Sequence, residues 1–474
     1  MRVSRRRFLG IAGGTVALGA AIPYLAQSAE TGTEVASQTP LPTPFTRPLP
    51  VPPVLKPGSH PDFPDADYYE VTESVARQEI LPGRSTEIWG YNGIFPGPTI
   101  VSRSGRRTVI KRTNALPAPT VTHLHGGQTP PESDGFPTDL VSPSSSRIYE
   151  YPLRQRPATL WYHDHTMGST APNNYRGLMG FHLIEDDENL PVPRGDRDIP
   201  LMITDRSFAA DGELLYPGMS HDSMAGVLGD VILVNGAPWP VLSVAAARYR
   251  FRLLNASNAR RYDLALDPVS PLVQIGSDGG LLAEPLSHDN IEVAPAERFD
   301  VVVDFSHYQP GQEVTLVNRL GEGPTAQVMR LRVGQPLTDT TSIPARLSTI
   351  DSLGPATVTR DFLFRYHDVW TINDKEFDPD TPLASPRLGD TEIWRFVSDF
   401  HHSIHIHLAQ FQVLSRNGEE PGPYDAGWKD TVDLRPTELV SVIARFTGYR
   451  GRYVMHCHNL EHEDMMMMGT IQVV

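Results

Sequence analysis

The chain has 474 residues, of which 39% are hydrophobic and 20% charged, and its formal net charge is −15. This composition is typical of a soluble globular protein of about three domains that can bury a large core. The acidic balance argues against nucleic acids and anionic membrane surfaces as partners. The single cysteine, Cys457, excludes an intramolecular disulfide.

Residues 1–30 are typical of an export signal. Paired arginines in the run Ser4 to Leu9 precede an apolar stretch, Ile11 to Ala21, as in twin-arginine signals. The stretch is too short and too rich in glycine for a good membrane span, and an uncleaved N-terminal anchor is the alternative. We expect export to the periplasm, the cell surface or the medium, without a stable membrane span after processing.

Residues 31–64 carry eight prolines between Pro40 and Pro57. Proline is excluded from helix interiors and from central strands. The segment is therefore predicted to be an extended, polyproline-like arm.

After residue 65, short runs rich in Val, Ile, Tyr, Phe and Thr alternate with Gly, Pro, Asn and Asp. This alternation is typical of β-sandwiches or barrels. A turn asparagine precedes a similar strand three times, at Asn92, Asn235 and Asn373, spaced by 143 and 138 residues. We predict an all-β chain of three related domains at residues 65–190, 191–345 and 346–474.

Eight histidines form four His-x-His pairs: His123 and His125, His163 and His165, His405 and His407, His456 and His458. Residues i and i+2 of a strand point to the same face, about 6.5 Å apart, so one pair can serve two nearby metal ions. A single pair is compatible with two ordinary histidines, but four pairs favour a metal cluster. Because the pairs fall only in the first and third domains, we expect the cluster at their seam.

Cys457 lies inside the last pair, and strand alternation directs it to the face opposite His456 and His458. A second site is expected there, with three further candidate ligands: His402, His462 and Met467. Two imidazoles, a thiolate and a weak thioether describe a blue-copper electron-transfer site. A dinuclear zinc hydrolase is the alternative, but it leaves the cysteine and methionine unexplained. A methionine neighbouring Met467 is the alternative axial ligand.

Four segments resemble, in the same order, the copper-binding motifs of multicopper oxidases: His123–Gly126, Trp161–His165, His402–His407 and His456–Met467. The resemblance extends from residue 65 to residue 474, and Trp89–Thr99 is similar to bacterial laccases of the spore-coat and bilirubin-oxidase type. It implies three cupredoxin-like Greek-key domains, with no copper ligand in the middle one. Ser403 stands where the family commonly has proline, which predicts a slightly looser blue-copper site.

The resemblance also implies four copper ions per chain. Type 1 copper would take His402, Cys457, His462 and Met467. Type 2 copper would take His123 and His405. The two type 3 coppers would take His125, His163 and His458, and His165, His407 and His456.

The activity that the resemblance implies is one-electron oxidation of phenols or aromatic amines, coupled to four-electron reduction of dioxygen to water. Electrons are expected to enter at an exposed edge of His462 or His402 and to pass through Cys457 to the histidine cluster. Oxidation of cuprous or ferrous ions is the rival activity. A copper-free exported scaffold is the rival from another class, but such proteins lose ligands and this chain keeps all of them.

Glu463 and Asp134 match acidic residues that supply or relay protons in similar laccases. The alternatives are a surface carboxylate for Glu463 and a turn-forming residue for Asp134. Asp164, between two ligand histidines, is expected to point away from the metals and to be structural.

Overall fold

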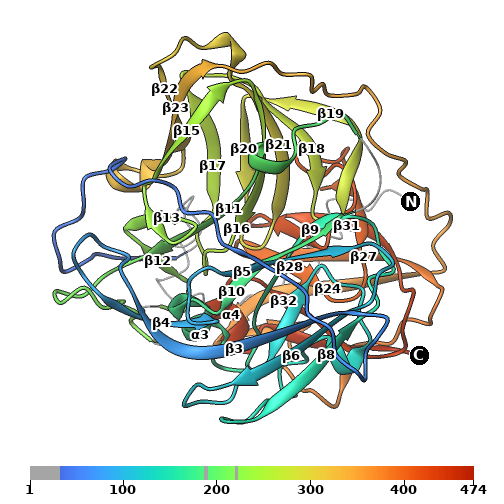
Figure 1. The fold of residues 1–474 in the computed structure, drawn as a ribbon. Coiled ribbons are helices and arrows are strands. Elements are labelled where there is room, and N and C mark those ends of the chain that lie inside the picture. Colours follow the sequence, from blue (N-terminus) through green and yellow to red (C-terminus); the bar gives the residue numbers. More distant parts are fainter. Residues whose placement is uncertain (1–31, 186–189, 219–222) are drawn as a thin grey trace.

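The computed structural model describes residues 32–185, 190–218 and 223–474, so the expected export signal lies outside the described residues. Strands dominate the chain, which confirms the all-β prediction. Figure 1 shows strands of the first third in blue to cyan, of the middle third in yellow-green and of the last third in orange to red. Within the described ranges, no helix is long and apolar enough to cross a membrane.

The first third of the chain forms two sheets whose apolar side chains pack between them. One sheet has the order β2 (Val54–Leu55), β5 (Gly97–Arg103), β10 (Met179–Glu185), β9 (Ala158–Asp164) and β7 (Thr122–His125). The other has the order β4 (Thr86–Tyr91), β3 (Asp67–Gln78), β6 (Thr108–Asn114) and β8 (Ser146–Tyr151). A short helix, α3 (Thr170–Arg176), connects β9 to β10.

The middle third also has two sheets. The larger has the order β14 (Ala237–Pro238), β13 (Val231–Val234), β11 (Asp198–Arg206), β16 (Arg248–Asn255), β21 (Arg298–Asp304), β18 (Leu272–Ser277) and β19 (Gly280–His288). The smaller has the order β15 (Val241–Ala246), β23 (Gln327–Pro336), β22 (Glu313–Asn318), β17 (Tyr262–Asp267) and β20 (Asn290–Val293). Their core is continuous with apolar residues of the first third, such as Phe95 and Trp161.

The last third repeats this arrangement with two five-stranded sheets. One has the order β25 (Val369–Ile372), β24 (Val358–His367), β27 (Thr391–Ser398), β31 (Leu439–Arg445) and β29 (Phe411–Arg416). The other has the order β26 (Pro382–Ala384), β33 (Met468–Val473), β32 (Gly451–Cys457), β28 (His402–Ile406) and β30 (Thr431–Leu434). Helix α4 (Leu460–Asp464) follows β32.

The three turn asparagines share one structural role. Asn92, Asn235 and Asn373 all adopt left-handed backbone, with φ of 55°, 50° and 56°, a conformation that asparagine tolerates. The side-chain oxygen of each accepts a backbone N–H bond of 2.7 to 2.9 Å from a preceding strand. The nearly equal spacing in the sequence therefore corresponds to equivalent turns, although the boundaries at 190 and 345 stay predictions.

The proline-rich segment runs along the first and middle thirds. Strand β1 (Thr33–Val35) pairs in parallel with β12 (Val227–Gly229), and β2 pairs in parallel with β5.

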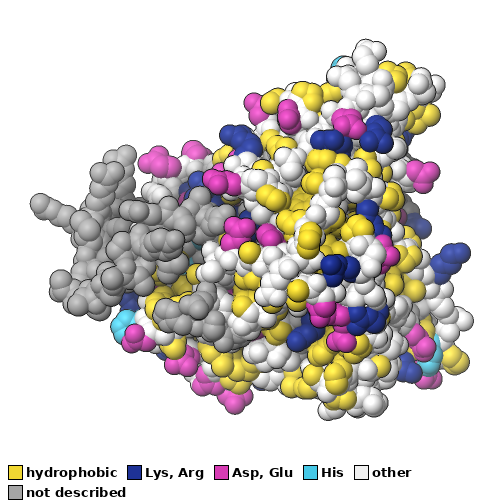
Figure 2. Space-filling model, turned by 90° about the vertical axis from the view of Figure 1, so that its left-hand side faces the viewer, with side chains coloured by type: hydrophobic (Ala, Val, Ile, Leu, Met, Phe, Trp, Pro, Cys, Tyr) yellow, Lys and Arg dark blue, Asp and Glu magenta, His cyan; other side chains and the backbone are white. Residues whose placement is uncertain are grey.

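On the face shown in Figure 2, acidic and basic side chains are interspersed with apolar ones among the residues drawn in colour.

Candidate metal centre

The four histidine pairs lie on two sheets from opposite ends of the chain. Strands β7 and β9 pair antiparallel with His123 opposite His163, and β28 and β32 pair with His405 opposite His456. All eight paired histidines are at most 1% exposed. Strand register therefore brings the four pairs to one buried seam, as the sequence predicted.

Three of these imidazoles form a tight triangle. The Nε2 atoms of His165, His407 and His456 are separated by 3.2, 3.3 and 3.3 Å. This spacing suits three nitrogens around one metal ion, because metal–nitrogen distances are about 2 Å. The three residues are the set expected for one type 3 copper.

The remaining paired histidines form two further groups. One nitrogen from each of His125, His163 and His458 lies within 4.8 Å of the others. Among the described residues, Nδ1 of His125 and Nε2 of His163 and His458 have no hydrogen-bond partner. The Nε2 atoms of His123 and His405 are 3.4 Å apart. Buried unpaired nitrogens of this kind are costly unless an ion satisfies them.

Burial keeps His125, His163, His165 and His407 uncharged. It lowers the pKa of His163 to about 3. Burial and the neighbouring imidazoles hold the pKa of His125, His165 and His407 well below the usual value. Neutral imidazole is the form that binds metal ions, so these four rings can bind cations without releasing a proton.

Asp134 contacts two of the histidines. Its backbone oxygen lies 2.6 Å from Nδ1 of His123, and its Oδ2 lies 2.7 Å from Nδ1 of His407. Both contacts leave the Nε2 atoms free for metal. Asp134 also ends the short 3-10 turn Pro131–Ser133, as the alternative interpretation expected. Burial raises the pKa of its carboxyl well above the usual value.

Glu463 contacts two others. Its Oε1 lies 3.2 Å from Nδ1 of His165, and its Oε2 lies 3.0 Å from Nδ1 of His456. Glu463 is 1% exposed, so the alternative of a surface carboxylate is wrong. Together with Asp134 it supports all three rings of the nitrogen triangle, in the manner of carboxylates behind metal-bound histidines.

Cys457 belongs to a separate group. Its Sγ lies 3.5 Å from Nδ1 of His402 and 3.6 Å from Nδ1 of His462, and these two nitrogens are 3.2 Å apart. Burial raises the pKa of the thiol to about 12, so a bound cation is needed to hold it as thiolate. The cysteine and its flanking histidines therefore serve different sites, as strand alternation predicted.

Met467 is placed beside this group by the backbone. Its N–H donates to the His462 carbonyl and its own carbonyl accepts from the Cys457 N–H, both at 3.0 Å. Its side chain is fully buried in the same apolar cluster as Cys457. Met468, by contrast, packs in another cluster with Phe136, which favours Met467 as the axial ligand.

The expected exposed imidazole edge is not observed. His402 and His462 are only 1% and 2% exposed. Trp370 stacks on His462 with ring centroids 3.8 Å apart, and its indole N–H donates to the Met224 carbonyl at 3.0 Å. The expectation is therefore wrong, because an aromatic ring covers the ligand at which donors were expected to make contact.

Ser403 and Asp164 have structural roles. The Ser403 hydroxyl donates to the Pro295 carbonyl at 2.6 Å, a bond between the last and middle thirds that proline cannot donate. The Asp164 carboxylate accepts bonds from the Thr166 N–H and the Asn173 side chain at 3.1 and 3.0 Å. Asp164 thus faces away from the histidine cluster, as expected.

Sequence reasoning missed Asp430. Its Oδ1 lies 3.1 Å from Nε2 of His125, and its carbonyl lies 2.9 Å from Nδ1 of His405. The sequence carries no sign of the contact between Asp430 and His405, because it depends on the pairing of β28 with β30, which places His405 opposite Thr431. No motif spacing links these positions.

Family models for multicopper oxidases match residues 74–189 and 342–474. The chain therefore belongs to the multicopper oxidase family, and it is a copper-dependent oxidoreductase that uses dioxygen.

Among its relatives, a laccase of Bacillus stratosphericus is 37% identical over 91% of this chain and 99% of its own length. The bilirubin oxidase of Albifimbria verrucaria is 37% identical over 92% of this chain and 82% of its own. The crystal structure of a laccase from Pediococcus acidilactici superimposes with a TM-score of 0.86, at 34% identity, covering 93% and 96% of the two chains. These similarities confirm the laccase-like resemblance.

Proposed function

We propose that the chain oxidises phenols or aromatic amines one electron at a time and reduces dioxygen to water with four copper ions. The observation that carries the proposal is the position of Cys457. It shares one site with His402 and His462, while its covalent neighbours His456 and His458 belong to the other.

The donor groups fit the proposed ions. Type 1 copper is assigned to His402, Cys457, His462 and Met467, a donor set typical of blue copper. Type 2 copper is assigned to His123 and His405. The type 3 ions are assigned to His125, His163 and His458, and to His165, His407 and His456. The unpaired buried nitrogens of His125, His163 and His458 support the assignment of an ion to that set, since a bound cation would satisfy them.

When bound, copper at the Cys457 site accepts single electrons, and copper at the histidine cluster reduces dioxygen. The chain contributes the connection between them, because the Cys457 peptide units lead directly to His456 and His458. Four donors lose one electron each, and four electrons with four protons convert dioxygen to two waters. The rigid strands hold both ends of this path.

Asp134 and Glu463 are proposed to hold and deliver the protons. Both carboxyl groups are buried, and they lie 2.7 to 3.2 Å from ring nitrogens of the histidine cluster. Among the described acidic residues, these two have the carboxyl oxygens closest to the rings of His165, His407 and His456. Positioned acids of this kind are general proton donors in enzymes.

Phenols and aromatic amines are proposed as donors because the relatives include laccases and a bilirubin oxidase. Oxidation of cuprous or ferrous ions is the second candidate. Of the four consecutive methionines, Met467 and Met468 are buried, so only Met465 and Met466, which are partly exposed, could offer a thioether to such ions at the surface. Export through the twin-arginine signal remains part of the proposal.

The proposal is tested by loading the purified protein with copper and recording its absorption and its oxygen uptake with phenolic, bilirubin and cuprous donors. An intense blue band and fastest uptake with phenols are expected. A colourless protein with full copper occupancy would contradict the type 1 assignment. Uptake confined to cuprous ions would favour the second candidate.

A further inference from the structure

Arg298 lies at the junction of all three parts of the chain. It begins β21 in the middle third and is completely buried. Its Nε donates to the Thr159 carbonyl of the first third at 3.0 Å, and its Nη1 donates to Asp430 Oδ1 of the last third at 2.7 Å. A second bond joins Nη2 to the other carboxylate oxygen of Asp430. This is a bidentate pair, the geometry that fixes a carboxylate most firmly.

Asp430 links Arg298 to the histidine cluster. Its Oδ1 also lies 3.1 Å from Nε2 of His125, and its carbonyl lies 2.9 Å from Nδ1 of His405. The first contact leaves Nδ1 of His125 free for metal, and the second leaves Nε2 of His405 free. The Arg298–Asp430 ion pair thus determines which ring nitrogen His125 and His405 each offer to a copper ion.

The loop after His125 is shaped to admit the pair. Gly126 has a φ of +85°, and a Cβ placed there would lie 2.7 Å from Nη2 of Arg298 and 2.8 Å from Oδ2 of Asp430. Any larger residue would displace the ion pair. The close approach indicates that the Arg298–Asp430 pair requires a glycine at position 126, directly after His125.

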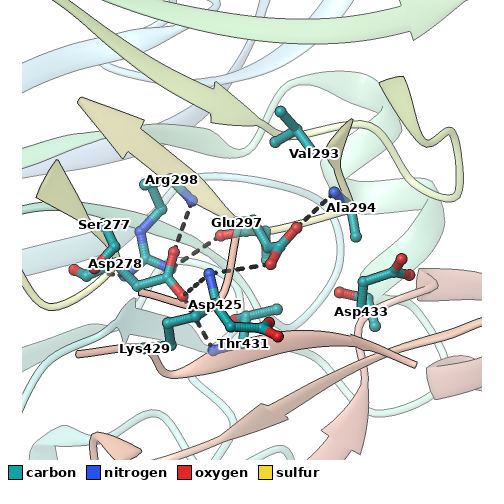
Figure 3. A network of polar contacts seen from close by, with 12 residues as sticks. Ser277, Asp278, Val293, Ala294, Glu297, Arg298, Asp425, Lys429, Thr431 and Asp433 are labelled. Atoms are coloured by element: carbon teal, nitrogen blue, oxygen red, sulfur yellow. Dashed lines mark hydrogen bonds and ion pairs between the residues drawn. The ribbon is translucent and has the colours of Figure 1, made fainter. Parts of the chain in front are cut away.

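Figure 3 shows further charged side chains beside Arg298. Asp278 accepts the backbone N–H of Arg298 at 2.8 Å, and its Oδ2 lies 3.3 Å from the Lys429 ammonium. Lys429 also lies 3.0 Å from Glu297 Oε1. These side chains are at most 5% exposed. The buried cations are therefore matched by carboxylates, as such groups require.

We propose that Arg298 is a positioning residue for the histidine cluster, acting through Asp430 on His405, which is assigned to type 2 copper, and on His125, which is assigned to a type 3 copper. The inference rests on the proposed function, since it concerns ligands assigned there. It gives the middle third a role in the cluster, although the metal-binding groups found among the described residues include none from residues 191–345.

The test compares Arg298→Lys and Asp430→Asn with the unaltered copper-loaded protein. Lysine keeps the charge but cannot make the bidentate pair. Asparagine keeps the shape but weakens the side-chain contacts with Arg298 and His125, and with them the pair that holds the Asp430 carbonyl against His405. We expect both variants to bind type 2 copper about 10 to 100 times more weakly, the usual effect of removing such support. The type 2 signal in electron paramagnetic resonance should change, while the blue type 1 band persists.

Arg261→Lys is the matched control. Arg261 is also buried and also joins the middle third to the last third, through an ion pair with Asp433. The contacts described for it include none of the eight paired histidines. It should keep the type 2 copper and its signal. If Arg298→Lys keeps them equally well, the proposal is overturned and the ion pair is only a connection between domains.

Failure of the proposed function would look different, because the unaltered protein would then lack the blue band or the type 2 signal. If Arg298→Lys does not fold, Asp430→Asn decides the question. A normal type 2 signal in folded Asp430→Asn would overturn the proposal, and a weakened one would support it.

Discussion

Oε2 of Glu463 lies 3.0 Å from Nδ1 of His456, the residue that immediately precedes the only cysteine. The same carboxylate lies 3.2 Å from His165 through its other oxygen. Helix α4 begins three residues after Cys457 and places Glu463 beside His456 of the preceding strand, β32. One short segment therefore contains Cys457, histidines of both groups and the acid beside the histidine cluster.

Glu463→Gln should slow dioxygen reduction about 10- to 100-fold, because the glutamine cannot deliver a proton or support both rings. Reduction of the type 1 centre by donors should stay normal. Stopped-flow absorption separates the steps, since the blue band would bleach at the usual rate and recover slowly in oxygen.

Glu461→Gln provides the control for that experiment. Glu461 is equally buried on the same helix, but it contacts Asn258 and Tyr216. Equal slowing in both variants would contradict a role for Glu463 at the cluster.

Cys457→Ser should abolish the blue colour and nearly all turnover with organic donors. The serine oxygen is a poor ligand for copper at this site, and the electron path through the thiolate is lost. Absorption spectroscopy and oxygen uptake measure the two effects. Retained turnover would show that electrons reach the histidine cluster by another path.

Removal of copper should lower the melting temperature by about 10 °C or more, because ions bound only to the folded state stabilise it. His125, His163 and His458 would then bury ring nitrogens that have no hydrogen-bond partner among the described residues. Calorimetry of the chelated and reconstituted protein tests this. An unchanged melting temperature, with copper confirmed absent, would argue against a buried metal cluster.

Asp339→Asn should reduce the free energy of unfolding by about 1 to 2 kcal/mol near neutral pH. Burial alone raises the pKa of Asp339, but hydrogen bonds from Arg197 and Thr341 hold it well below the usual value. The lowered pKa means that the stabilisation is present above the unfolded-state pKa and is lost as pH falls through the folded one. Denaturant titrations should therefore converge for the two proteins in acid. A difference that persists there would exclude the carboxylate charge as its cause.

The residues whose role follows from strand alternation were predictable. The four histidine pairs and Cys457 are local patterns, and period-two geometry alone separates the cysteine from its neighbours. The equivalent turns at Asn92, Asn235 and Asn373 were predictable because a turn asparagine precedes a similar strand at nearly equal spacing.

Contacts that depend on tertiary packing were not predictable. Arg298 meets Asp430 across 132 residues of sequence, and neither residue stands in a motif. Trp370 of strand β25 covers His462 of helix α4, so the expected exposed imidazole edge was wrong. Such contacts arise when separate sheets pack, which periodicity in one segment cannot indicate.

The most direct test of the central account is the ratio of donor oxidised to dioxygen consumed by the copper-loaded protein. Two cooperating sites, one receiving single electrons and one reducing dioxygen completely, predict four equivalents of a one-electron donor per dioxygen and no hydrogen peroxide. Two equivalents with accumulation of hydrogen peroxide would contradict it.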